Sequence, residues 1–234
     1  MHNTLALTIH RNNRDPEPIR FNVLRMFNAG WAGRDKSALE HHIQELAEHG
    51  IPRPQHVPTL FALGNHLLTA QDSIQVHGDQ TSGEIEFVLL WHQGEALVTV
   101  GSDHTDRRLE AHSIPKSKNM CLNVLARDLW PLSELRDHWD SLQLTCHVHS
   151  QKGKELYQQD TLASLLGPDY WMRDLQDRLG SLTDGLVLFS GTIGTKAGLI
   201  VGQTYNLEMH DPILKRTIRH SYSCEVLTGA IEDY

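Results

Sequence analysis

The chain has 234 residues, 39% of them hydrophobic and 21% charged, so it is long enough to bury a core without disulfide or metal cross-links. Its 21 Lys and Arg against 29 Asp and Glu give a formal charge of −8. That balance argues against a nucleic-acid or anionic-membrane surface, because both need a basic field. No apolar run approaches the roughly 18 residues of a membrane-spanning helix.

The N-terminus and the cysteines indicate the compartment of the protein. The N-terminus, Met1–Thr4, has no basic region followed by an apolar stretch, so we expect no signal peptide. The three cysteines have no C-x-x-C spacing, which makes a disulfide framework or a thiolate zinc site improbable. Both observations favour a cytoplasmic location.

In the first half of the chain, the pattern predicts a hairpin, a helix and a second hairpin. The first 26 residues contain two apolar runs around a polar turn at 11–16. Residues 35–49 are predicted to be a helix that Asp35 caps and that Gly50 ends, because apolar residues recur on one face. Prolines then enforce extended chain. From Glu84 to Val100 the pattern is strand, turn, strand.

In the second half, strands outnumber helices. The expected helices are Pro131–Trp139, Leu162–Leu166 and Tyr170–Leu179, and the expected strands are Leu142–Val148, Leu186–Phe189, Thr204–Met209 and Thr217–Tyr222. The helices and strands do not alternate regularly, which excludes a doubly wound parallel sheet. The sequence therefore predicts an α+β protein, mostly β, with a mixed or antiparallel core and peripheral helices.

Three carboxylates are spaced so that they can converge. Glu84 and Glu86 share one face of a strand, because side chains alternate along it with period two. The returning strand would deliver Asp103 just beyond its end. Like charges so placed repel unless a cation holds them, and hard oxygen ligands suit Mg²⁺, Mn²⁺ or Ca²⁺. The alternative is a solvated strand face that carries two glutamates.

Other groups could take part in acid–base or anion chemistry. His42 and Glu45 lie three residues apart on the predicted helix, so the carboxylate could orient the imidazole as a general base. The cations that follow Asp103 could bind an anionic substrate; they are Arg107, Arg108, Lys116 and Lys118. The turn that ends the strand at 184–192 offers backbone N–H groups that can hold a carboxylate.

A different metal site is also conceivable from the residues. His147 and His149 flank Val148 on a predicted strand and share a face, which could form a two-histidine zinc site. No third ligand is apparent nearby.

Taken in order, these motifs resemble those of the fumarylacetoacetate hydrolase superfamily over roughly residues 22–222. NAGWAGRD (residues 28–35) is similar to its Gly-Tyr-rich stretch, His42–Glu45 to its H-x-x-E motif, and PRPQHVPTLF (residues 52–61) to its proline-rich segment. Glu84 and Glu86 resemble its E-x-E metal motif. GSDHTDRR (residues 101–108) resembles the segment that supplies a third ligand and an arginine, here Asp103 and Arg107.

The resemblance continues towards the C-terminus. Lys116-Ser117-Lys118 is similar to the family's K-S element, and of the two lysines Lys118 is favoured as the active-site one. DGLVLFSGTI (residues 184–193) resembles a strand-ending segment and places the substrate-contacting threonine at Thr192. Glu110 stands where the family has a glutamine. The family's lysine after Phe61 is missing, and the stretch between Glu86 and Asp103 is short, so the hairpin must return directly.

The resemblance implies a fold and a chemistry. The fold is a mixed β-sandwich roll with peripheral helices, usually dimeric, formed by a single domain over 1–234 with residues 1–60 as an N-terminal hairpin and lid-helix region. The activity is metal-dependent hydrolysis of a C–C bond in a 2-oxo or 1,3-dicarbonyl acid, through an enolate that Mg²⁺ or Mn²⁺ stabilises. The partner is thus a small-molecule carboxylate.

The roles implied are equally specific. Glu84, Glu86 and Asp103 would hold the metal, and His42 with Glu45 would activate water. Arg107 and Lys118 would hold developing negative charge, while Thr192, Lys116 and Glu110 would contact the substrate. The same site would serve a decarboxylase, tautomerase or dehydratase, and a relative that only binds ligands would need no base.

Overall fold

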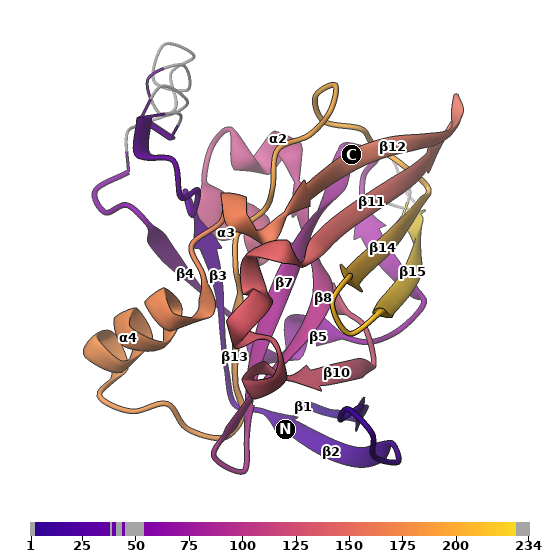
Figure 1. Cartoon of the computed structure of the whole chain (residues 1–234). Helices are drawn as coiled ribbons and strands as arrows, with labels where there is room; N and C mark the ends of the chain where they lie inside the picture. The colour runs from indigo at the N-terminus through magenta and orange to yellow at the C-terminus, as the bar shows by residue number, and fades with distance from the viewer. Residues whose placement is uncertain (1–2, 38, 41–43, 45–53, 228–234) are drawn as a thin grey trace.

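The computed structural model describes residues 3–37, 39–40, 44 and 54–227. Two sheets form the molecule, and Figure 1 shows the five-stranded one lying against the centre of the larger one. The larger sheet has the order β2-β1-β10-β8-β7-β13-β3-β4, with β5 and β9 attached beside β8. The smaller sheet has the order β12-β11-β14-β15-β6. This is the expected α+β class with a mixed, mostly β core.

The strands of the larger sheet are β1 (Asn3–Ile9), β2 (Glu17–Val23), β3 (Arg25–Gly30), β4 (Thr59–Leu63), β5 (Leu68–Thr69), β7 (Thr81–His92), β8 (Glu95–Asp106), β9 (Asn123–Leu125), β10 (Asp128–Pro131) and β13 (Leu186–Phe189). Those of the smaller sheet are β6 (Ser73–His77), β11 (Gln143–Ser150), β12 (Gly153–Thr161), β14 (Thr204–Asp211) and β15 (Arg216–Leu227). The helices are α2 (Arg107–Glu110), α3 (Ile114–Lys118), α4 (Pro168–Leu179) and the 3₁₀ helices η1 (Asn65–Leu67), η2 (Leu132–Glu134), η3 (Arg136–Ser141) and η4 (Leu162–Ser164).

The hairpin of β7 and β8 is the centre of the fold. The two strands pair without interruption from Thr81 opposite Asp106 to His92 opposite Glu95. Gln93 and Gly94 both have positive φ, at 51° and 77°, which is the turn that continues the right-handed twist of a hairpin. The core consists of two buried apolar clusters, and each face of this hairpin packs on a different one of them.

The hairpin is longer than the sequence pattern indicates. Asp103 was expected just beyond the end of the second strand, and that expectation is wrong: β8 continues to Asp106. The polar run Ser102–Thr105 gives no apolar alternation, yet its side chains are fully buried because β7, β9 and the second sheet surround them. Polar pairing, rather than hydrophobicity, extends the strand.

Several other expectations need correction. The second N-terminal run is divided at Leu24 between β2 and β3, and Pro131–Trp139 is not one helix but the end of β10 followed by η2 and most of η3. The helix expected at Leu162–Leu166 is only η4. The predicted hairpin of β1 and β2 is confirmed, as are β13 and a helix that Gly180, at φ 79°, ends.

The predicted helix at 35–49 is described in part. Lys36, Ser37, Leu39, Glu40 and Gln44 are helical. Asp35 Oδ1 accepts the N–H of Ser37 at 2.9 Å, as the predicted N-terminal cap should. The rest of the helix, with the expected Gly50 cap, lies outside the described residues.

A buried charge group ties the tip of the β14–β15 hairpin to η3. Asp211 has no exposed surface, and its Oδ1 accepts the N–H groups of Ile213 and Leu214, each at 3.0 Å. His138 Nε2 lies 3.1 Å from the same oxygen and Arg216 Nε lies 3.4 Å from Oδ2. Burial opposes the charged carboxylate, but the N–H groups of Leu214 and Ile213 together with His138 outweigh it and lower the pKa of Asp211.

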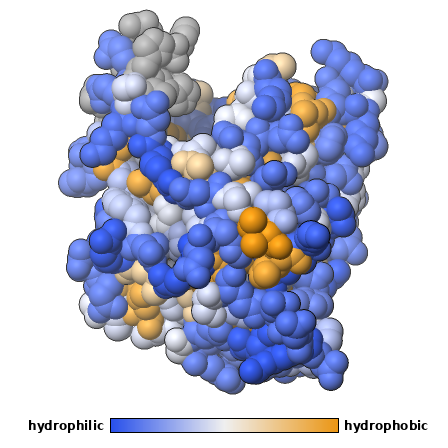
Figure 2. Space-filling view, in the orientation of Figure 1, coloured by the Kyte–Doolittle hydropathy of each residue, from blue (hydrophilic) through white to orange (hydrophobic). Residues whose placement is uncertain are grey.

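The visible surface is mostly hydrophilic. Figure 2 shows apolar residues gathered only in small separate patches on this face. Within the described ranges, no helix is long and apolar enough to cross a membrane.

Candidate metal centre

The three predicted carboxylates come together on one face of the β7–β8 hairpin. Glu84 lies directly opposite Asp103, and Glu86 lies opposite Gly101. Carboxylate oxygens of the three residues lie within 4.8 Å of one another. Glu86 and Asp103 are 1% and 0% exposed, whereas the Glu84 side chain keeps 17% exposure and so marks the open side.

Two glycines make room for this arrangement. A Cβ at position 101 would lie 2.7 Å from the Val124 carbonyl oxygen and 2.8 Å from the Phe189 ring, so only glycine fits opposite Glu86. Gly191 has φ +83°, a conformation that favours glycine, and donates its N–H to Glu86 Oε2 at 2.8 Å. The turn after β13 therefore does hold a carboxylate, and that carboxylate is the protein's own Glu86.

Two cations face the carboxylates. Lys118, on α3, forms a buried ion pair with Asp103 and lies 5.8 Å from the centre of the Phe61 ring. Arg107, at the start of α2, lies 3.3 Å from Glu84 and donates to Glu110 at 2.8 Å and to Ser82 Oγ at 2.7 Å. Short helices directly after β8 thus return both cations to the hairpin.

The other predicted basic residues lie away from the carboxylates. Lys116 is exposed, one residue before the buried part of α3. Arg108 is also exposed, and its nearest acidic partner is Asp79 at 3.8 Å. Between Lys116 and Lys118, which the sequence left open, the geometry brings only Lys118 to the site. Glu110 pairs with Arg107, and its predicted contact with substrate stays a prediction.

Burial shapes the charge of the site. Burial raises the pKa of Glu84, although Arg107 and Lys118 partly oppose that rise. Burial and then the neighbouring Asp103 raise the pKa of Glu86 well above its usual range. Burial alone would lower the pKa of Lys118, but the carboxylates around it, Asp103 first, raise it overall. The three carboxylates therefore carry more negative charge than Arg107 and Lys118 neutralise.

The donor set fits a hard divalent cation. Three carboxylates supply only oxygen atoms, which Mg²⁺, Mn²⁺ and Ca²⁺ prefer, and none of the soft or imidazole donors that favour zinc. Burial and then the neighbouring Asp103 disfavour the charged form of Glu86, and a bound cation would favour that form. Among the described residues this is the one group of three or more potential ligands, so His147 and His149 gain no third ligand there.

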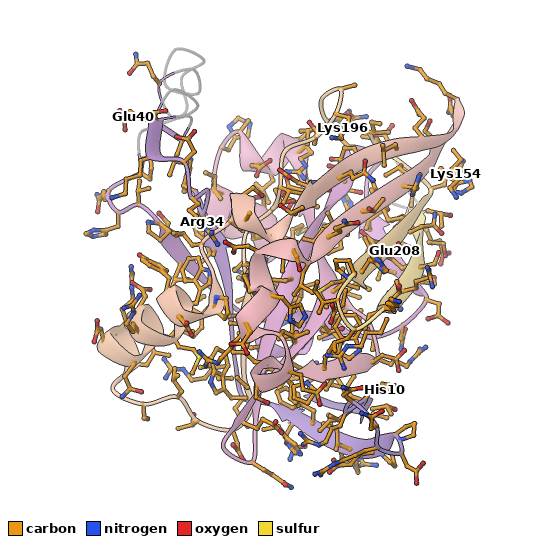
Figure 3. All side chains as sticks on the ribbon, in the orientation of Figure 1. His10, Arg34, Glu40, Lys154, Lys196 and Glu208 are labelled. Carbon is orange, nitrogen blue, oxygen red and sulfur yellow. The ribbon has the colours of Figure 1, made fainter. Side chains whose placement is uncertain are left out.

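The remaining predicted residues are placed as follows. Thr192 Oγ1 donates to the Ile85 carbonyl at 2.8 Å and accepts from Gln158 Nε2 at 2.7 Å, so its hydroxyl supports β7. His42 and Glu45 lie outside the described residues. Figure 3 labels Glu40, from the same predicted helix, and Arg34, close to the end of β3. Sequence reasoning missed Gln158 because β12 is a polar strand without apolar alternation.

A family profile described as "Protein of unknown function (DUF2848)" matches residues 29–222. The chain belongs to this family. The matched residues include both strands of the carboxylate hairpin, both cations and the turn at Gly191. A search of curated protein sequences gives no match.

Solved structures of other proteins share this fold. One is 2-keto-3-deoxy-D-arabinonate dehydratase complexed with magnesium and 2,5-dioxopentanoate; it has 16% identity, a TM-score of 0.61, and coverage of 88% of this chain and 74% of that chain. Another is 5-carboxymethyl-2-hydroxymuconate delta-isomerase from Mycobacterium smegmatis, with 15% identity, a TM-score of 0.62, and coverage of 93% and 87%.

A third structure carries the name of the superfamily itself. It is a fumarylacetoacetate isomerase/hydrolase candidate from Oleispira antarctica, with 17% identity, a TM-score of 0.62, and coverage of 94% of this chain and 99% of that chain. The predicted resemblance to the fumarylacetoacetate hydrolase superfamily is therefore confirmed at the level of the fold. At these identities the likeness establishes only the fold of this DUF2848 member. Its reaction has to be inferred from its own residues.

Proposed function

We propose that this protein is a Mg²⁺- or Mn²⁺-dependent enzyme that hydrolyses a C–C bond in a 2-oxo or 1,3-dicarbonyl acid. The observation that carries the proposal is the convergence of Glu84, Glu86 and Asp103 within 4.8 Å on a buried hairpin face. Carboxylates this close repel one another, and Glu86 and Asp103 are buried as well, so a bound cation would lower the free-energy cost of the arrangement.

The surroundings of the three carboxylates support a negatively charged substrate. When bound, the ion would supply Lewis-acid stabilisation of negative charge on substrate oxygens. Arg107 and Lys118 lie beside the carboxylates and can attract the carboxylate group of the substrate and hold charge as it develops. Most of the site is buried, which excludes water and strengthens each of these interactions.

The proposed hydrolysis needs a base. His42, with Glu45 fixing its orientation, is our candidate on the basis of their i, i+3 spacing. The base would take a proton from water while the water oxygen bonds to the distal carbonyl carbon. The adjacent C–C bond would then break, its electron pair would remain on the 2-oxo fragment, and that fragment would take up a proton.

A second candidate reaction shares the same residues. The fold is that of a dehydratase solved with magnesium and a dioxo acid, and of an isomerase. Dehydration, tautomerisation or decarboxylation of a 2-oxo acid would use the three carboxylates, Arg107 and Lys118 without a hydrolytic water. A relative that only binds a ligand would have the site and no turnover.

The test is a substrate screen with the purified chain. Acylpyruvates, oxaloacetate and 2-keto-3-deoxy acids are incubated with Mg²⁺ or Mn²⁺ while the enol absorbance and the products are followed. We expect metal-dependent cleavage into two fragments that a chelator abolishes and that the Glu86→Gln variant lacks. A single product of unchanged carbon number would assign dehydration or tautomerisation, and release of carbon dioxide would assign decarboxylation.

Two further outcomes would overturn the proposal. Metal binding without turnover of any compound in the screen would favour a ligand-binding protein. Bound zinc at one ion per chain that survives Glu86→Gln and is lost on replacing His147 would favour the zinc alternative. We also propose that the enzyme is cytoplasmic and that it forms a homodimer. Light scattering would test the homodimer by comparing the solution mass with the 26.5 kDa of one chain.

A further inference from the structure

The back of the β7–β8 hairpin faces the second sheet, and Tyr222 of β15 contacts it beside Asp103. The Tyr222 hydroxyl lies 2.8 Å from Ser102 Oγ and 3.0 Å from His104 Nδ1. Ser102 and His104 are the residues immediately before and after Asp103. One hydroxyl of the second sheet therefore joins both neighbours of a candidate ligand.

The position of that hydroxyl is fixed. Tyr222 has no exposed surface, and its ring stacks on Tyr205 with centroids 5.2 Å apart and 14° between the planes. The hydroxyl reaches the hairpin because position 83 is glycine: a Cβ there would collide with the Tyr222 oxygen. Tyr222 thus acts as a rigid support for β8 at Asp103.

A second side chain of the same sheet supports β7. Gln158 of β12 has no exposed surface; its Oε1 accepts the Ile85 N–H at 2.9 Å, and its Nε2 donates to Thr192 Oγ1 and the Ile193 carbonyl, each at 2.7 Å. Ile85 is the residue between Glu84 and Glu86. Thr192 in turn donates to the Ile85 carbonyl at 2.8 Å.

These side chains replace a missing strand. The neighbouring strand β13 pairs with β7 as far as Phe189 opposite Val88 and then ends. At Ile85 the backbone N–H and C=O on that side therefore have no strand partner, and Gln158 and Thr192 bind them instead. The backbone that carries both glutamates is held at one point by two buried hydrogen bonds.

We propose that Tyr222 and Gln158 are positioning residues that fix the spacing of Glu84, Glu86 and Asp103 and thereby select a small divalent ion over a larger one. This inference rests on the proposed metal site. Mg²⁺ demands near-octahedral ligands at about 2.0–2.1 Å, whereas Ca²⁺ accepts about 2.3–2.6 Å and irregular geometry. A rigid ligand set can favour the smaller ion, and a loosened set loses that preference.

The experiment is calorimetric titration of the full chain with Mg²⁺, Mn²⁺ and Ca²⁺. The main variants are Tyr222→Phe, which removes only the hydroxyl, and Gln158→Met, which keeps the side-chain length without its amide. Ser102→Ala removes the same Tyr222 hydrogen bond from its other end, so the question can be answered if a β15 or β12 variant does not fold. The melting temperature of each metal-free variant is measured alongside.

The matched control is Thr99→Val. Thr99 is also a buried hydroxyl on β8, but its Oγ1 donates to the Asp128 carbonyl of β10 at 2.7 Å, away from the residues that flank the ligands. This control loses a buried hydrogen bond on the same strand. It should lower the melting temperature without changing the order of ion affinities.

We expect Tyr222→Phe, Gln158→Met and Ser102→Ala to weaken Mg²⁺ and Mn²⁺ binding by about 10-fold or more, as loss of a group that orients a metal ligand does. Ca²⁺ binding should change less, so that the Ca²⁺/Mg²⁺ affinity ratio rises. An unchanged ratio in the variants that fold, with wild-type Mg²⁺ affinity, would overturn the positioning role alone. Absence of any divalent-ion binding by the wild-type chain would overturn the proposed metal site, and this inference with it.

Discussion

At the scale of single residues, the ion pair between Lys118 and Asp103 has a consequence for how an ion can enter. Asp103 is fully buried, and Lys118 supplies the positive charge that it needs. A bound cation would provide the same charge to the same oxygen. We therefore expect Lys118 to be released from Asp103 when an ion binds and to become available to a substrate anion.

Exposure separates residues that look equivalent in the sequence. Lys116 and Lys118 differ by two positions, and on the short helix α3 only the second turns towards β8. Glu110 and Thr192, which are predicted to contact substrate, also have partners within the protein: Glu110 pairs with Arg107, and Thr192 donates to the Ile85 carbonyl. Strand alternation could place Glu84 and Glu86 on one face, and the return of the hairpin could bring Asp103 near them. Spacing could not predict which polar groups bond to each other.

The first prediction concerns Asp211 and acid stability. Because its pKa is lowered in the folded protein, this carboxylate stabilises the fold above its unfolded pKa of about 3.9, and that stabilisation is lost as pH falls through the folded pKa. Asp211→Asn should cost about 1–3 kcal/mol at pH 7, where the charged hydrogen bonds are intact, and less at lower pH. Urea unfolding between pH 7 and pH 3 measures this.

The control for that prediction is Asp177→Asn, an exposed carboxylate on α4. It should leave both the unfolding free energy and its pH dependence close to those of the wild type. A constant difference between Asp211→Asn and the wild type at every pH would contradict the assigned ionisation.

At the scale of elements, the sequence predicts the strands and helices whose apolar residues follow a regular period. The β1–β2 hairpin, β13 and α4 follow from alternation, apolar runs and a glycine stop. β12 was missed because its exposed and polar residues carry no period, and the polar end of β8 was taken for a loop. β12 forms a hairpin with the preceding strand β11, and the end of β8 continues its pairing with β7. The buried polar side chains on them, Gln158 and His104, bond to groups from distant parts of the chain.

The second prediction is that Gly101→Ala destabilises the β7–β8 hairpin. The added Cβ would meet the Val124 backbone carbonyl and the Phe189 ring at less than 3 Å, so the strands must shift. Overpacking of this kind costs about 1–3 kcal/mol, which urea unfolding would detect. Gly33→Ala is the matched control, because a Cβ there meets nothing within 4 Å and should be tolerated. Equal stability of the two variants would contradict this prediction, because it would mean that the strands accommodate the added Cβ at position 101 without loss of unfolding free energy.

The third prediction concerns the segment 35–49, which the sequence predicts to be a helix. If His42 is the general base, His42→Ala should lower kcat by roughly 10²–10⁴ and leave Mn²⁺ affinity nearly unchanged, since a base contributes about that factor. Glu45→Gln should cost less, because it misorients the base without removing it. His41→Ala is the neighbouring control, about 100° around a helix. Turnover of the true substrate by His42→Ala at the wild-type rate would exclude this role.

At the scale of the whole molecule, the fourth prediction links metal binding to stability. Mn²⁺ at 100 times its Kd should stabilise the folded chain by about 2.7 kcal/mol, because only the folded state assembles the three carboxylates. For a chain of this size that raises the melting temperature by roughly 5–10 °C, and a chelator should reverse it. Glu86→Gln should lose most of this response.

Glu208→Gln is the control, because Figure 3 shows Glu208 on the second sheet and its partner is Arg219 at 2.8 Å. It should keep the full response to Mn²⁺. A shift that survives in Glu86→Gln would mean that the ion binds elsewhere.

All three carboxylates lie on a single uninterrupted hairpin, residues 81–106, and this affects how the site can be inherited. A genetic crossover outside this stretch transmits all three candidate ligands, whereas the segment at 35–49, predicted to be a helix, and the turn after β13 are encoded separately and can be exchanged one at a time. Lineages built on this hairpin can thus retain one ion site while they acquire different bases and different substrate contacts. We expect reactions to diverge among them faster than metal requirements do.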